Sequence, residues 1–218
     1  MNHQNKTTDK NPLFVLPWRG VNNSRILFRE AIARRKFSLV YLLVIWSIIV
    51  LLGFASTVDC ESTWQYAFQC EYSFWIKYLV DKPLIFVRNL FTTPFIHNGI
   101  DHILFVSVLG ILVIVQSHEV LFDSKKTALI FFSSYFTVAP FFAIVYNIGI
   151  EIYSDSEFLN HVIGRSWVGG SIGMFQVYGS LATKARRPFF LLAIPLLFES
   201  FNLMVVGIHP QISIMHVM

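Results

Sequence analysis

The stretch from Phe37 to Ala55, FSLVYLLVIWSIIVLLGFA, contains 19 consecutive residues without a charge. At 1.5 Å per residue, a helix of about this length crosses the roughly 30 Å hydrocarbon layer of a bilayer. A cleavable signal peptide fits less well, because 36 residues precede the stretch and no convincing small-residue cleavage pattern follows it. The stretch therefore predicts a first transmembrane helix.

The composition of the whole chain agrees with a membrane environment. Of the 218 residues, 55% are apolar and 14% are charged, and 22 are Phe. Soluble domains carry about 25% charged residues, and a chain of this size buries too little surface to hide so many apolar side chains. This composition argues against a nucleic-acid-binding protein. With only two cysteines, the chain can form neither a disulfide scaffold nor a four-cysteine zinc site.

Further apolar segments predict further helices. They lie at residues 100–116, 128–150, 167–182 and 189–207, and another segment begins at Pro210. We expect an all-α, polytopic membrane protein with six helices, the sixth truncated at the end of the given chain.

The positions of the cations predict the orientation, because cytoplasmic loops retain Lys and Arg. Thirteen of the 17 cations fall in residues 1–36 and in the loops after the second and fourth spans: Lys6, Lys10, Arg19, Arg25, Arg29, Arg34, Arg35, Lys36, Lys125, Lys126, Lys184, Arg186 and Arg187. We expect a multi-pass protein of the cell membrane with a cytoplasmic N-terminus. The basic segment 1–36 then directs topology and is attracted to anionic lipid.

The predicted outer loop, residues 56–99, mixes aromatic and charged residues, which is typical of the lipid-water boundary. It predicts short amphipathic helices that lie in the outer leaflet and pack on the bundle. Cys60 and Cys70 both fall in this loop, where they form a disulfide or remain two thiols.

Three groups of polar residues fall at the outer ends of the predicted spans. A polar side chain inside a bilayer costs free energy, so these positions are candidates for a functional site. They are residues 94–102, residues 168–175 around Ser171, and residues 209–216, which end at His216. Ser171 lies roughly 6 Å and His216 roughly 9 Å below the outer surface by helical rise. The three groups thus reach the same outer third of the bilayer.

A hydroxyl and an imidazole at one depth are the minimum for nucleophilic catalysis. His216 would take the proton of Ser171 and return it to the leaving amine. The start of a helix at Ser171 supplies free N–H groups for a developing oxyanion, and His102 could donate a second hydrogen bond there.

Simpler interpretations stand beside this one. Gly169-x-x-x-Gly173 is also a helix-packing pattern in membranes, with Ser171 as one more small interface residue. His97 and His102 could anchor a loop. Metal binding is disfavoured, because no two histidines have the helical spacing of a metalloprotease with a carboxylate between them; we expect neither metal nor cofactor.

Three motifs in this order resemble those of rhomboid intramembrane serine proteases. FTTPFIHNGIDHILF, residues 91–105, looks like the second-helix motif, and GGSIGMFQVYG, residues 169–179, looks like the nucleophile helix. ISIMH, residues 212–216, resembles the start of the sixth helix. The resemblance covers most of the chain from Phe37 onward.

The resemblance implies a membrane domain over residues 37–218, a six-helix bundle with a water-filled cavity that cleaves transmembrane protein substrates near their outer boundary. The resemblance also implies a role for each site residue. Ser171 would be the nucleophile, His216 the base, His102 an oxyanion donor and Phe175 an aromatic surface. Gly169 and Gly170 would support the site, and His97 and Glu119 would be structural. No nucleic-acid partner is implied.

Two positions depart from the family pattern. Val106 stands where many rhomboids have an asparagine that donates to the oxyanion, and Ile172 stands where they have glycine after the nucleophile. A shifted alignment that places Ile172 at the nucleophile position implies an inactive protein. The alternative function is therefore a catalytically inactive rhomboid-like protein that binds or escorts membrane clients. A small transporter has no support from inverted repeats.

Overall fold

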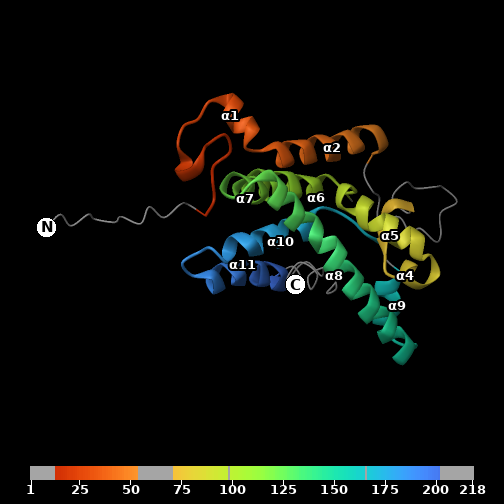
Figure 1. Cartoon of the computed structure of the whole chain (residues 1–218). Helices are drawn as coiled ribbons and strands as arrows, with labels where there is room; N and C mark the ends of the chain where they lie inside the picture. Colours follow the sequence, from red (N-terminus) through yellow and green to blue (C-terminus); the bar gives the residue numbers. More distant parts are fainter. Residues whose placement is uncertain (1–12, 54–70, 98, 165, 202–218) are drawn as a thin grey trace.

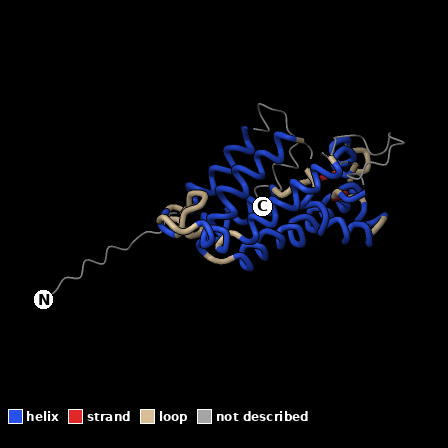
Figure 2. The backbone as a smooth tube through the Cα atoms, turned by 90° about the horizontal axis from the view of Figure 1, so that it is seen from above, coloured by secondary structure: helices blue, strands red, loops and turns tan. Residues whose placement is uncertain are grey.

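The computed structural model describes residues 13–53, 71–97, 99–164 and 166–201. Within these parts the chain is mostly helical, as predicted. One antiparallel ladder was not predicted: β1 (Phe74–Trp75) pairs with β2 (Ser166–Trp167). Figure 2 shows this ladder at the end of the molecule remote from the N-terminal segment.

The described helices follow one another along the chain. They are η1 (Val21–Asn23), α1 (Phe28–Ala33), α2 (Lys36–Leu52), α4 (Tyr78–Asp81), α5 (Pro83–Thr92), η2 (Thr93–Phe95), α6 (Ile100–Leu104), η3 (Phe105–Val115), α7 (Gln116–Leu121), α8 (Ser124–Ile152), α9 (Glu157–Ile163), α10 (Ser171–Ala182) and α11 (Pro188–Phe201). The segments α6, η3 and α7 form one continuous helix whose middle has wider π-helical turns. Such turns are rare and occur frequently at functional sites.

Two of the described helices are long and apolar enough to cross a membrane. They are Ile100–Leu121, with 22 residues, and α8, with 29 residues. The helices Lys36–Leu52 and Pro188–Leu197 are apolar but shorter. These lengths and compositions are compatible with a membrane protein.

The main core lies where α10 packs between η3 and α8 (Figure 1). Close approach depends on two glycines. A Cβ at Gly110 would lie 2.6 Å from Sδ of Met174, and one at Gly173 would lie 2.8 Å from the ring of Phe131. The small-residue pattern of the sequence therefore does mediate helix packing, at least at Gly173.

The boundary of α10 corrects the sequence prediction. Residues 167–182 were expected to form one helix, yet the helix begins at Ser171 because residues 166–167 belong to β2 and Gly169 has a φ of +104°. A left-handed φ interrupts a right-handed helix. The start of the helix therefore falls at the predicted nucleophile.

The described part of the predicted outer loop contains short helices, as expected. On α5 apolar side chains lie on both the buried and the exposed side. Phe86 and Leu90 are buried, while Leu84, Val87 and Phe91 are exposed at 86%, 52% and 59%. The outward side of α5 thus carries large apolar side chains.

Candidate active site

The candidate site is built around Ser171, the first residue of α10, with Gly170 at the N-cap. The side chain is buried, with an exposed fraction of 4%. The first-turn N–H groups of a helix have no acceptor within the helix, and they carry the positive end of its dipole. The hydroxyl therefore lies at a position suited to support negative charge.

Gly169 brings an imidazole to this position. A Cβ built on Gly169 would lie 2.1 Å from Cε1 and 2.8 Å from Nε2 of His102. Together with the φ of +104°, this contact leaves room only for glycine. The His102 ring, from α6, thus lies against the backbone two residues before Ser171.

Two buried tyrosines hold the backbone on both sides of this contact. The hydroxyl of Tyr135 donates to the carbonyl of Gly169 at 2.7 Å, and that of Tyr41 donates to the carbonyl of Pro94 at 2.5 Å. The N–H of Gly169 donates to the carbonyl of Thr93 at 3.1 Å. Neither tyrosine was predicted as a site residue from the sequence. A hydroxyl within an apolar span was the signal that could have identified them.

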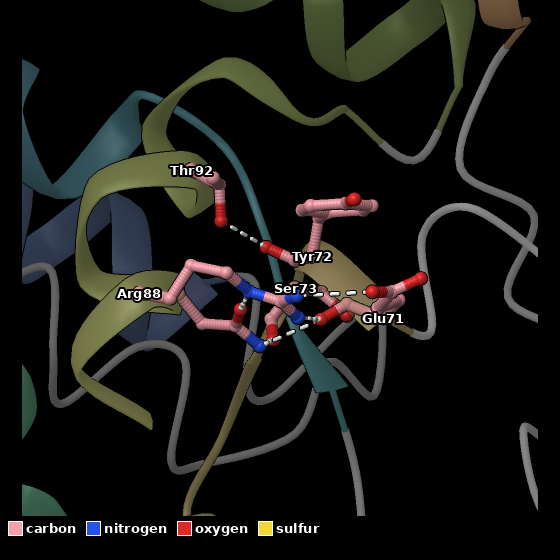
Figure 3. A network of polar contacts seen from close by, with 6 residues as sticks. Glu71, Tyr72, Ser73, Arg88 and Thr92 are labelled. Atoms are coloured by element: carbon pink, nitrogen blue, oxygen red, sulfur yellow. Dashed lines mark hydrogen bonds and ion pairs between the residues drawn. The ribbon is translucent and has the colours of Figure 1, made fainter. Parts of the chain in front are cut away.

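Polar contacts within residues 71–92 hold the chain around β1, the partner of strand β2, which lies shortly before Ser171. Arg88 on α5 donates to the Glu71 carboxylate at 2.9 Å, and its guanidinium lies 4.5 Å from the ring centroid of Tyr72. Thr92 donates to the carbonyl of Tyr72 at 2.6 Å (Figure 3). Glu71 and Tyr72 lie just before β1 in the chain, and β1 pairs with β2. The ladder therefore connects the outer segments to the backbone just before the site.

His97 lies beside His102, with ring centroids 5.0 Å apart and an interplanar angle of 52°. It is buried, with 1% exposure, and desolvation together with the neighbouring His102 lowers the pKa of His97 to about 3. Within the described residues neither of its ring nitrogens has a hydrogen-bond partner, nor has the Thr93 hydroxyl. A buried polar group without a hydrogen-bond partner costs desolvation free energy, and such groups are rare in folded proteins.

The residues that depart from the rhomboid pattern also lie near the start of α10. A Cβ on Gly170 would be 3.3 Å from Cγ1 of Val106, which is fully buried. Ile172 is half-buried and packs against the main core and against a second apolar cluster that includes Phe74, Phe142 and Trp167. Phe175, one turn after Ser171, packs against the main core. An apolar side chain, Val106, thus occupies the position where the resemblance implies an amide donor.

Glu119 is not part of this arrangement. Glu119 lies at the far end of its helix, where it accepts hydrogen bonds from the N–H groups of Phe37 and Ser38 at 2.6 and 2.9 Å. His216, Cys60 and Cys70 lie outside the described residues. Among the residues that are described, no group of three or more His, Cys, Asp or Glu is placed to hold a metal ion.

The fold and the site thus define a bundle of apolar helices in which a buried serine begins a helix beside an imidazole. Comparison of the chain with protein-family models, with curated proteins and with solved structures finds no match in any of the three.

Proposed function

We propose that this chain is an intramembrane serine endopeptidase that cleaves transmembrane proteins near the outer boundary of the bilayer. Ser171 is the nucleophile and His216 the general base. The observation that carries the proposal is the contact between His102 and Gly169, since it joins an imidazole to the start of the helix that begins with Ser171. The protein is then a multi-pass protein of the cell membrane with its N-terminus in the cytoplasm.

In this mechanism His216 takes the Ser171 proton while the serine oxygen attacks the scissile carbonyl. The oxyanion of the tetrahedral intermediate accepts hydrogen bonds from the first-turn N–H groups of α10 and from His102. Collapse breaks the peptide bond, and His216 gives its proton to the leaving amine. Water, deprotonated by His216, then attacks the acyl carbonyl. The ester bond to Ser171 breaks, and His216 returns the proton to the serine oxygen.

The test is cleavage of a reporter transmembrane segment by the full chain in proteoliposomes. We expect Ser171→Ala and His216→Ala each to reduce cleavage by at least about 10³-fold, the scale of losing a catalytic serine or histidine. Ser180→Ala, on the same helix, is the matched control and should retain activity. Cleavage that survives Ser171→Ala would refute the assignment.

One observation favours a second candidate, a catalytically inactive relative that binds or escorts membrane proteins. The fully buried Val106 offers no hydrogen-bond donor beside Gly170, and an oxyanion donor typically contributes 10²- to 10³-fold in rate. This candidate predicts that folded protein retains a bound client without cutting it, and that Ser171→Ala leaves client retention unchanged.

A further inference from the structure

Residues 13–35 form an ordered segment at the inner end of the bundle, beside the start of α2 and the end of α7 (Figure 1). The N–H of Val15 donates to the Ser117 hydroxyl at 2.9 Å. The buried guanidinium of Arg35 donates to Gln116 Oε1 at 2.7 Å and to the carbonyl of Ala31 at 3.1 Å. These bonds fix which side of the segment faces away from the bundle.

The outward side of this segment, which we call the N-terminal face, carries large apolar side chains. Its members are Leu16, Trp18, Leu27, Phe28 and Ile32, exposed at 61%, 47%, 78%, 69% and 39%. The ring centroids of Trp18 and Phe28 lie 5.6 Å apart, so an apolar contact joins the chain around Trp18 to helix α1. Exposed apolar surface of this kind marks an interaction site.

The same segment is strongly basic. Besides the buried Arg35 it contains Arg19, Arg25, Arg29 and Arg34, of which the last three are exposed, and Lys36 follows at the start of α2. Glu30 is the one acid in the sequence from residue 13 to residue 36, and its carboxylate already pairs with Arg34 at 2.9 Å. Apolar side chains interleaved with cations match the chemistry of anionic phospholipid head groups above an acyl layer.

The depth of the segment fits this partner. Helix α1 ends at Ala33 and the apolar helix α2 begins at Lys36. Three residues of chain reach at most about 11 Å, and the head-group region adds about 5 to 8 Å on each side of the hydrocarbon core. If α2 crosses the bilayer, α1 cannot lie far from the head groups.

We propose that the N-terminal face docks on anionic phospholipid head groups of the leaflet at the inner end of the bundle, with Trp18 and Phe28 inserted among the lipids and Arg25 and Arg29 bound to phosphates. The proposal requires that the chain spans a membrane. It is independent of the chemistry at Ser171, so loss of protease activity has no bearing on it.

The first test measures the depth of Trp18 in proteoliposomes that contain brominated phospholipids. The fluorescence difference between wild type and Trp18→Phe isolates Trp18 from the other four tryptophans. We expect brominated lipid to reduce this difference by at least about twofold, as for a ring at the interface. If aqueous iodide quenches the Trp18 fluorescence and brominated lipid does not, the proposal is overturned. The face is then exposed to water or binds a protein.

The second test retains Trp18 and measures its energy transfer to dansyl-phosphatidylglycerol and to dansyl-phosphatidylcholine. We expect transfer to the anionic probe to be about twofold stronger, and the excess to disappear in Arg25→Gln/Arg29→Gln or in roughly 0.5 M salt. Lys77→Gln/Lys82→Gln, at the opposite end, is the matched control and should keep the excess. Equal transfer to both probes in wild type would overturn the assignment of an anionic lipid partner.

Discussion

At the scale of single residues, Gly169 is the position on which the site depends most. Its φ of +104° and the 2.1 Å distance from a built Cβ to His102 Cε1 mean that a side chain would both strain the backbone and displace the imidazole. The sequence predicted that Gly169 supports the nucleophile. The sequence alone could not show that the His102 ring packs against Gly169, because the two residues are far apart in the chain.

Gly169→Ala should therefore destabilise the protein by about 2 to 4 kcal/mol, combining the left-handed backbone penalty with overpacking. Thermal unfolding in detergent checks this. The matched control is Gly179→Ala on the same helix, where a Cβ meets nothing within 4 Å. That variant should be neutral or gain up to about 1 kcal/mol from helix propensity. Equal stability of the two variants would contradict the described packing.

Val106 is the second decisive residue, because it lies beside Gly170 without a donor. If Ser171 is catalytic, Val106→Asn should raise the cleavage rate by about tenfold or more by adding an oxyanion donor. Val106→Leu, which adds no donor, is the control. An unchanged rate in folded Val106→Asn, measured in the reporter assay, would argue that this side chain does not face the oxyanion.

At the scale of elements, α2 obtains its N-terminal cap from another helix. None of its own side chains caps it. Instead the buried Glu119 carboxylate accepts from the N–H groups of Phe37 and Ser38, from the Ser38 hydroxyl at 2.7 Å and from the Ser124 hydroxyl at 2.6 Å. The sequence marked Glu119 as structural through a resemblance. Its partners on α2 could not be predicted from spacing, since they lie 81 and 82 residues away.

Glu119→Ala should cost about 1 to 3 kcal/mol, because it leaves buried backbone donors of α2 without an acceptor. Glu30→Ala removes a carboxylate that pairs with Arg34 at the exposed surface, and should change stability by less than about 0.5 kcal/mol. Denaturation midpoints of the two variants in the same detergent make the comparison. A Glu119→Ala variant as stable as Glu30→Ala would contradict the capping role.

The boundaries of elements show where sequence patterns stop being informative. Apolar runs predicted α2, α8 and the start of α11 closely, because length and hydropathy decide where such helices lie. They missed the ladder of Phe74–Trp75 with Ser166–Trp167, which is only two residues long and depends on tertiary contact. The delayed start of α10 has the same cause.

At the scale of the whole molecule, stability should depend on pH through His97. Its folded pKa of about 3 lies below the unfolded value near 6.5, so the folded state favours the neutral ring. This contribution is fully present above pH 6.5 and is lost as pH falls toward 3, at about 1.4 kcal/mol per pH unit. Thermal unfolding between pH 4 and pH 7 should show this slope, and His97→Gln should flatten it. An equally steep slope in the variant would assign the dependence to other groups.

The central claim is that Ser171 is a reactive nucleophile activated by His216, and covalent labelling tests it most directly. Folded, full-length protein treated with a fluorophosphonate should carry one adduct within the tryptic peptide of residues 166–184. Fragmentation should map that adduct to Ser171 rather than to Ser166 or Ser180, and His216→Ala should abolish it. An unlabelled serine in folded wild type, or an adduct that persists in His216→Ala, would contradict the account.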